Sequence, residues 1–145
     1  SDVQAIVDLA LACAARFPRQ VTVNITPFVP KAHTPFQRTA QTPAKEVKRR
    51  LARVERGLRK HHIGVKSESP AWAEIQGVLA RGDRQIAQAL LAVERPSPAA
   101  WRQALEAAGL SLPELLAGRP AGEPLPWAFI QSGARPPSSP INPAP

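Results

Sequence analysis

The sequence predicts a mostly α-helical fold with a small β component, in which one helix and one strand precede a helical C-terminal subdomain. Three observations support this prediction. Apolar residues recur at helical spacing over most of the chain, one short segment alternates with β-branched residues, and a Pro-rich segment separates the two regions. A chain of 145 residues is also long enough to bury a core of moderate size.

The first 26 residues contain the predicted helix and strand. Apolar residues at helical spacing predict an amphipathic helix over 2–16, which Pro18 ends. The alternating, β-branched run from Val21 to Ile25 predicts a strand. Because a lone strand leaves its backbone groups unsatisfied, we expect it to join a sheet that this chain does not supply. That expectation includes unpaired strand edges and an exposed apolar stripe on helix 2–16.

Residues 27–43 are predicted to form an ordered, extended connection. The Pro residues within it fix φ and disfavour helix in the residue before each one. It also carries Phe28, Val29 and Phe36, which a solvated linker would not need.

The helical subdomain is predicted over residues 44–133. We expect Thr42 to cap its first helix, with Pro43 at the first helical position and the last turn near Lys60. The apolar stripe of this helix consists of Val47, Leu51, Val54 and Leu58. Residues 63–66 are a candidate for a short second strand.

Four shorter helices are expected after residue 70. The first presents an apolar face that includes Trp72, Ile75, Val78 and Leu79. The signals that separate the helices are Gly82 as a stop, Asp83 as an N-cap, Ser97-Pro98 as a start, Gly109 as a stop and Ser111 to Glu114 as a capping box. The side chains of Trp72, Trp101 and Trp127 are predicted to anchor the core. Residues 134–145 are rich in Pro and are expected to be a disordered tail.

Composition excludes several classes of site. The single cysteine, Cys13, excludes an internal disulfide and any multi-cysteine metal or iron–sulfur site within this chain. Cys13 itself is expected on the inward face of the first helix as a small core residue. No apolar run is long enough to span a membrane, and the first 15 residues lack the basic region of a signal peptide. We therefore expect no membrane partner and a cytoplasmic location.

The beginning of the chain is also unusual. The sequence contains no Met and begins at Ser1. Together with the strand that lacks a nearby partner, this predicts that the chain is one piece of a longer protein.

Residues 44–61 carry most of the net charge of +8. Eight basic residues against Glu46 and Glu55 leave +6 in this segment. The basic residues are Lys45, Lys48, Arg49, Arg50, Arg53, Arg56, Arg59 and Lys60. One hypothesis is a surface that contacts the phosphates of an RNA partner, chiefly through Arg49, Arg50, Arg53 and Arg56. The other is a solvated outer face, which the absence of interleaved aromatic residues favours.

Two other patterns are explained more simply by structure. His61 and His62 are adjacent on a helix and point to different faces, so no metal site is predicted there or with His33. The tripeptide Arg81-Gly82-Asp83 has the sequence of an integrin ligand, but a helix stop followed by an N-cap accounts for all three residues.

The segment from Asn24 to Gln37, NITPFVPKAHTPFQ, follows the predicted strand directly. Loops at this end of a strand bind ligands in α/β folds, and Lys31 and His33 can contact an anionic group there. A rigid connection whose Phe side chains plug the domain junction explains the same residues.

This segment resembles the end of the catalytic domain in radical S-adenosylmethionine proteins with a cobalamin-binding domain. The resemblance spans about residues 20–133. It continues in the basic segment RRLARVERGLRK from Arg49 to Lys60, the stretch from Ile63 to Trp72, the turn ARGDR from Ala80 to Arg84 and the element EPLPW from Glu123 to Trp127.

The resemblance implies that residues 1–26 are the last helix and strand of a partial (βα) barrel. It implies that the whole protein is an enzyme that holds a [4Fe–4S] cluster and S-adenosylmethionine, with cobalamin as a further cofactor of the family, and generates a 5′-deoxyadenosyl radical. This chain would close the barrel and line the substrate rim, would be inactive by itself, and would have the missing N-terminal part as its partner. The predicted rim residues are Asn24, Thr26, Lys31, His33 and Gln37. The alternative is a stand-alone basic RNA-binding module.

The sequence departs from the family at three places. Arg38 stands where the family usually has Trp, so either its side chain must reorient or the loop must shift. The family pattern ends after Gly133. The CxxxCxxC motif that binds the cluster is absent, so this chain cannot hold the cluster alone.

Overall fold

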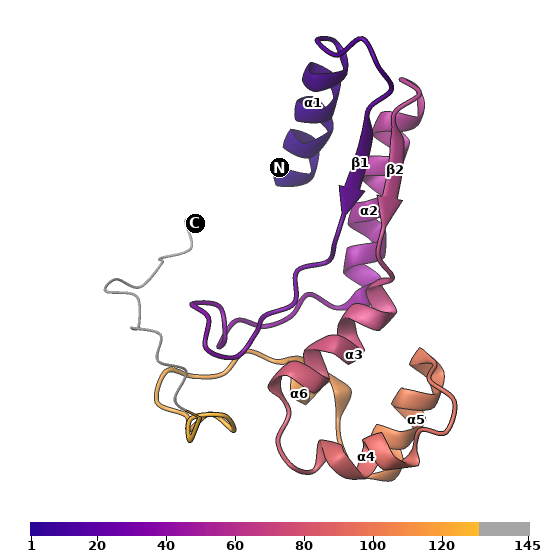
Figure 1. Cartoon of the computed structure of the whole chain (residues 1–145). Helices are drawn as coiled ribbons and strands as arrows, with labels where there is room; N and C mark the ends of the chain where they lie inside the picture. Colours follow the sequence, from indigo (N-terminus) through magenta and orange to yellow (C-terminus); the bar gives the residue numbers. More distant parts are fainter. Residues whose placement is uncertain (131–145) are drawn as a thin grey trace. The chain divides into compact units, whose positions relative to one another are not determined.

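A computed structural model describes residues 1–130 (Figure 1), so the predicted tail at 134–145 lies outside the described residues. The described part contains six helices and a parallel sheet of two strands, which confirms a mostly helical fold with a small β component. In chain order the elements are α1 (Asp2–Ala14), β1 (Thr22–Ile25), α2 (Ala44–Arg59), β2 (Gly64–Ser67), α3 (Pro70–Arg81), α4 (Ile86–Ala92), α5 (Pro98–Ala107) and α6 (Leu112–Leu116).

The chain folds into two compact units, each built from two stretches of sequence. The first unit consists of Ser1–Phe28 and Thr42–Ala73 and contains the sheet, α1 and α2. The second consists of Val29–Gln41 and the chain from Glu74 onward, with most of α3 and with α4, α5 and α6.

The strand at 22–25 has a partner in this chain, so the prediction of a lone strand was wrong. β1 pairs in parallel with β2, in a register that runs from Thr22 opposite Gly64 to Ile25 opposite Ser67. Parallel strands need a long crossover, and α2 supplies it by returning the chain to the start of the sheet. Sequence alone identified a candidate strand at 63–66, but the pairing depends on how α2 packs.

Both helices of the first unit lie on one face of this sheet. Val7 and Ala10 of α1 form a buried cluster with Val54 and Leu58 of α2 and with Ile63. The inward side chains of both strands, which are Val23, Ile25 and Val65, pack against this cluster. Side chains alternate along a strand, so Thr22, Asn24 and Lys66 point away from the helices, and all three are exposed.

The apolar stripe of α1 is only partly exposed. Val7 and Ala10 are buried, whereas Leu9 is 67% exposed. Cys13 is exposed, which corrects the prediction that it is a core residue. Val7, Ala10 and Ala14 mark the packed side of α1, and Cys13 lies about 100° around the helix from Ala14.

The core of the second unit joins four helices. It consists of Val78, Ile86, Ala89, Ala104, Leu105 and Leu116. Trp101 and Trp127 are buried, as predicted. Trp72 is 41% exposed, so the prediction that it anchors the core was wrong. The buried stripe of α3 passes through Ile75, Val78 and Arg81. Arg81 is polar, so the apolar pattern of the sequence does not show that this position is buried.

The signals around α5 are confirmed. The hydroxyl of Ser97 accepts a hydrogen bond of 3.1 Å from the backbone N–H of Ala100. At the other end, Gly109 has a left-handed φ of 70°, and its N–H donates to the carbonyl of Glu106. The N–H of Leu110 donates to the carbonyl of Leu105, which completes a Schellman motif.

Three other predicted caps differ from the structure. Pro43 is itself the N-cap of α2, because its ψ of 145° is extended, and Thr42 therefore lies outside the helix. α4 begins at Ile86 after Gln85, although the Asp83 carboxylate accepts a bond of 2.8 Å from the Gln85 N–H. Ser111 is the N-cap of α6 but makes no side-chain capping bond.

Candidate functional site

The face of the sheet opposite the helices is polar. Asn24 and Lys66 are partners in the parallel register, so both project from adjacent strands on this face. Both side chains are exposed. The sequence analysis predicted Asn24 as a site residue but not Lys66. The alternation of apolar Val65 with polar Lys66 in the candidate strand was the sequence feature that could have indicated Lys66. Together they place an amide beside an ammonium group, which suits an anionic or carbonyl-bearing ligand.

A cavity of about 220 Å³ lies in the first unit, next to the end of β1. Most of its lining is apolar, and the charged residues on it are Asp2 and Arg50. The apolar lining includes Val3, Ile6, Ile25, Pro27, Phe28, Val47, Leu51 and Val54. The carboxyl ends of parallel strands are the usual place for ligands in α/β folds. Thr26 follows β1 directly and is exposed.

The other predicted rim residues belong to the second unit. Lys31 and His33 are exposed. His33 has a left-handed φ of 57°, and its backbone N–H donates to the Gln37 side-chain oxygen at 3.1 Å. That oxygen also accepts a bond of 2.8 Å from the indole Nε1 of buried Trp127. The amide oxygen of Gln37 is therefore engaged within the fold, whereas Lys31 is available to a ligand.

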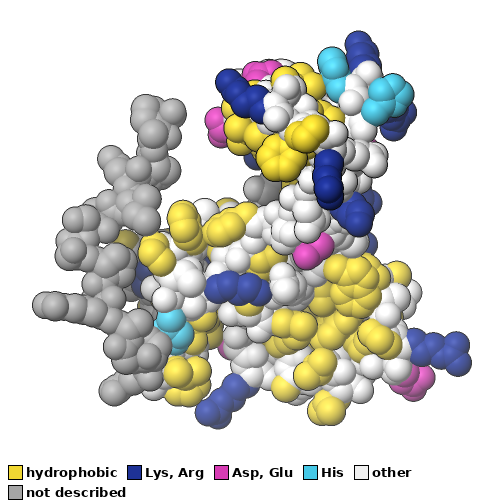
Figure 2. All heavy atoms as spheres, turned by 45° about the horizontal axis from the view of Figure 1, so that its top comes forward, with side chains coloured by type: hydrophobic (Ala, Val, Ile, Leu, Met, Phe, Trp, Pro, Cys, Tyr) yellow, Lys and Arg dark blue, Asp and Glu magenta, His cyan; other side chains and the backbone are white. Residues whose placement is uncertain are grey.

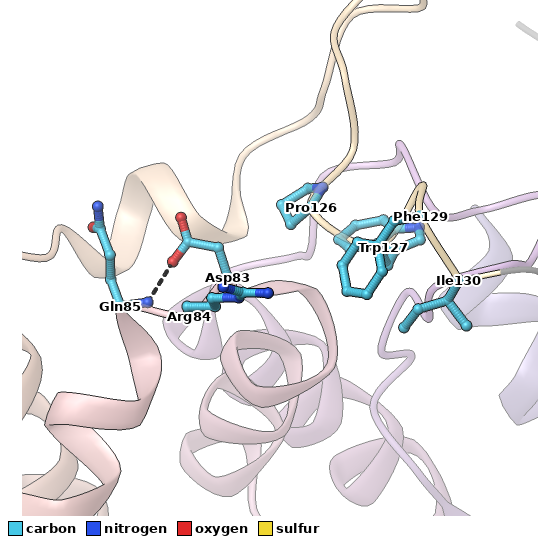
Figure 3. A pocket seen from close by; sticks show the side chains of 8 residues that line it. Asp83, Arg84, Gln85, Pro126, Trp127, Phe129 and Ile130 are labelled. Carbon is cyan, nitrogen blue, oxygen red and sulfur yellow. Dashed lines mark hydrogen bonds between the residues drawn. The ribbon is translucent and has the colours of Figure 1, made fainter.

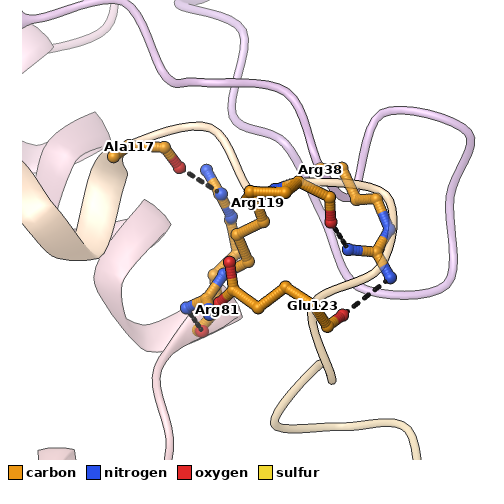
Figure 4. Close-up of polar contacts among 6 residues, drawn as sticks. Arg38, Arg81, Ala117, Arg119 and Glu123 are labelled. Atoms are coloured by element: carbon orange, nitrogen blue, oxygen red, sulfur yellow. Dashed lines mark hydrogen bonds and ion pairs between the residues drawn. The ribbon is translucent and has the colours of Figure 1, made fainter.

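Buried Arg81 connects distant backbone segments of the second unit, and Figure 4 shows it near Ala117 and Arg119. Its guanidinium donates to the carbonyl of Thr39 at 3.0 Å and to the carbonyl of Ala117 at 2.8 Å. Burial, followed by the charge of Arg119, lowers the pKa of Arg81. Because Arg81 is inaccessible, the Arg81-Gly82-Asp83 tripeptide is not displayed as a ligand.

Arg38 occupies the position at which the sequence departs from the family pattern. Its guanidinium donates to the carbonyls of Pro120 and Glu123 (Figure 4). Its own carbonyl accepts a bond of 2.9 Å from the N–H of Arg119. Arg38 thus ties the loop at 29–41 to the chain after α6 through backbone carbonyls.

A hollow of about 670 Å³ lies in the second unit, between the turn after α3 and the chain around Trp127 (Figure 3). Asp83 and Arg84 supply charge on one side. Pro126, Trp127, Phe129 and Ile130 line the other side, and Phe129 is 76% exposed. The sequence did not indicate this hollow, because it joins residues that are far apart in the chain.

The basic residues of α2 and Lys60 are all exposed. The Glu46 carboxylate pairs with Arg49 at 2.8 Å and with Arg50 at 2.7 Å. Hydrogen bonds from Arg49 and then Arg50 lower the pKa of Glu46 from 4.5 to about 2, and the bond from Glu46 raises the pKa of Arg49. Within residues 1–130, no salt bridge involves Arg53, Arg56 or Lys60.

The described residues do not fit the iron–sulfur cluster that the resemblance implies. No group of three or more His, Cys, Asp or Glu side chains in this part of the chain is arranged to hold a metal ion. The sequence has one cysteine, whereas the cluster needs three thiolates. Separately, none of the helices between residues 1 and 130 is both long and apolar enough to span a bilayer.

Comparison with known proteins identifies no relative. The chain matches no family model, no curated protein and no solved structure. Function is therefore inferred from the residues and their geometry.

Proposed function

We propose that this chain forms the C-terminal part of a radical S-adenosylmethionine protein of the cobalamin-binding type. In this proposal β1 and β2 extend the sheet of a partial (βα) barrel, and the helices from α3 onward form a C-terminal subdomain. The family assignment comes from the sequence resemblance, and the observation that supports the barrel part of the proposal is a parallel strand pair with helices on one face and an exposed polar face on the other.

The polar face is compatible with the inner side of a partial barrel. Parallel sheets are normally covered on both faces, and their strands are then apolar on both sides. In a (βα) barrel, by contrast, helices cover the outer face only, and the inner face meets the interior. Thr22, Asn24 and Lys66 have the polarity expected of strands that face a ligand-binding interior.

The edges of the sheet support a larger parent structure. Within the described residues, each strand has a neighbour on one side only. A two-stranded parallel sheet is a poor template for independent stability, because its open edges leave backbone groups unpaired. Ile6, Leu9 and Phe17 are also exposed apolar side chains on this unit, and a neighbouring part of the same protein would cover them.

In the parent protein this chain would contribute to the substrate rim. Asn24 and Lys66 would line the interior face, and Thr26, Lys31 and His33 would lie on the loop that leaves the barrel. Gln37 would act as a positioning residue, since its amide oxygen holds Trp127 and the backbone of His33. The cluster, S-adenosylmethionine and cobalamin would be held by residues outside this chain.

The size of the native protein tests this proposal. An antibody raised against the chain should detect a protein well above 15.6 kDa in the source cell, and peptide mass spectrometry of that band should find a CxxxCxxC segment. A native protein of about this mass that carries no other sequence would refute the proposal.

The rim assignment has its own test in that full-length protein. Asn24→Ala and Lys66→Ala should each lower the substrate-dependent release of 5′-deoxyadenosine while the iron content stays unchanged. Gln88→Ala, an exposed change in α4, is the matched control. Equal release from all three variants would show that the polar face does not line the site.

A further inference from the structure

The exposed side of α2 carries a continuous row of cations. At 100° per residue, Lys45, Arg49, Arg53, Arg56 and Lys60 fall within one narrow sector, opposite the buried stripe of Leu51, Val54 and Leu58. The row runs from Lys45 to Lys60, which is fifteen steps of 1.5 Å or about 22 Å. Neighbouring cations are three or four residues apart, which separates them by about 5–6 Å.

Within the described residues, Arg49 is the one cation of this row that forms a salt bridge. Glu46 partly neutralises Arg49 and also pairs with Arg50. Toward the end of α2, Arg53, Arg56 and Lys60 form no salt bridge with any residue of the described chain. Figure 2 shows Lys and Arg side chains gathered with His at the top of the view.

A groove borders these three cations. It has a volume of about 420 Å³ and lies between α1 and α2. One wall is formed by Arg53, Arg56, Lys60 and His61, and the other by Val3, Gln4, Val7 and Leu11. Gly57 allows α1 to lie close, because a Cβ at this position would come within 3.0 Å of Val7.

Helix stability does not account for the whole row. Cations near the C-terminus of α2 interact favourably with the helix dipole, which explains Arg56 and Arg59. The same dipole disfavours Lys45 in the first turn and is negligible at Arg53. The helix dipole therefore does not explain why the row extends over the whole length of α2.

We propose that the cationic row on α2 binds the phosphate backbone of a single-stranded nucleic acid and that the adjacent groove receives an unstacked base. The spacing of the cations suits consecutive phosphates along an extended strand. The groove offers an apolar wall for a base, and the side-chain oxygen of Gln4 and the imidazole of His61 for its edge, while the Gln4 Nε2 donates to Asp8 at 2.9 Å. This inference does not depend on the proposed enzymatic parent.

A membrane surface is the less suitable anionic partner. An amphipathic helix binds a bilayer by inserting its apolar face. The apolar face of α2 is occupied, since Leu51, Val54 and Leu58 are buried in the first unit. This surface is also not suited to stacking many bases, because among the described residues that line the groove His61 is the one that carries a ring. Binding should therefore depend strongly on salt and weakly on sequence.

Fluorescence anisotropy on the intact chain tests the cationic row. The probes are a labelled 20-nucleotide single-stranded RNA, the DNA of the same sequence, the corresponding RNA duplex and vesicles with anionic headgroups. The triple variant Arg53→Gln, Arg56→Gln, Lys60→Gln should bind the single strand at least about tenfold more weakly, and its log affinity against log salt should flatten by about 2. The control Arg19→Gln, Arg84→Gln, Arg95→Gln removes the same charge from exposed positions elsewhere.

A second pair of variants tests the groove. Gln4→Glu places an anion on its apolar wall and should weaken binding of the single strand more than Gln88→Glu, which adds the same charge on α4. Circular dichroism verifies that both variants are folded.

Preference for either single strand over the duplex, lost in the triple variant only, supports the proposal. It is overturned by equal losses in the triple variant and its control, by tighter binding of the duplex or the vesicles, or by equal effects of the two Gln→Glu changes.

Discussion

Arg81 Nη1 donates a hydrogen bond of 3.0 Å to the backbone carbonyl of Thr39, a residue forty-two positions earlier in the chain. The same guanidinium reaches Ala117, and Arg119 in turn donates to the carbonyl of Arg81 at 3.2 Å. Arg81 thereby joins the end of α3 to two irregular segments whose carbonyls would otherwise lack these donors. Because Arg81 is buried and its donors bond to backbone carbonyls, its role is to fix the geometry of these loops and not to bind a ligand through its charge.

Replacement of Arg81 should destabilise the second unit. Arg81→Met keeps much of the side-chain volume but leaves the carbonyls of Thr39 and Ala117 without these bonds, which should cost about 3 kcal/mol of unfolding free energy. Urea denaturation followed by circular dichroism measures the change. Arg84→Met removes a neighbouring exposed charge and should shift stability by less than about 0.5 kcal/mol. Similar denaturation curves for both variants would contradict the structural role of Arg81.

The bond between Gln37 and Trp127 should be measurable as a coupling. Gln37→Met leaves the buried indole N–H of Trp127 without its acceptor and should lower the unfolding free energy by about 1–3 kcal/mol. In a Trp127→Phe background the same change should cost less, because that N–H is gone. A double-mutant cycle measures the difference, and strictly additive effects would show that the bond contributes nothing.

Gly109 is needed for its backbone conformation and not for space. No atom outside its neighbours lies within 4 Å of a Cβ built there, but its φ is 70°. Gly109→Ala should therefore lower stability by about 1 kcal/mol. Gly122→Ala is the matched control, because Gly122 is equally open and has no positive φ. Thermal unfolding of both variants decides the matter, and equal melting temperatures would refute a conformational requirement.

Glu46 should titrate well below an ordinary carboxyl group. Hydrogen bonds from Arg49 and Arg50 lower its pKa to about 2 in the folded chain, against 4.5 ordinarily. The stabilisation from this group is thus complete above pH 4.5 and is lost as the pH falls toward 2. Carboxyl carbon shifts in an NMR titration measure the folded value. In the variant Arg49→Gln, Arg50→Gln the pKa should rise toward 4.5, and an unchanged midpoint would exclude the arginines as the cause.

Prediction from sequence succeeded where a local pattern determines local structure. The helices predicted at 2–16 and from 44 to about 60 are observed at 2–14 and 44–59, and α5 follows from Ser97-Pro98 at its start and Gly109 at its end. Prediction failed where the apolar spacing of a helix was compatible with burial of either of two neighbouring helix faces. Cys13 and Trp72 each lie to one side of a helical stripe, and only packing shows which side is buried.

The assignment of rim residues stays a prediction, and the structure shows where these residues lie. Asn24 lies on the polar face of the sheet, but its neighbour Lys66 could be identified only once the register of β1 and β2 was known. Gln37 was predicted as a rim residue, and the structure gives its amide oxygen two donors from within the fold, Trp127 Nε1 and the His33 N–H.

By itself, the sequence determined the positions of most helices, the short strand at its Pro-rich boundary and the concentration of positive charge on α2, because these depend on neighbours within a few residues. Only the tertiary structure decided that β1 pairs with β2, that Arg81 is buried, and that one face of the sheet remains polar and open. Each of these depends on contacts between residues about forty positions apart, and no local periodicity encodes which distant partner a strand or a guanidinium will meet.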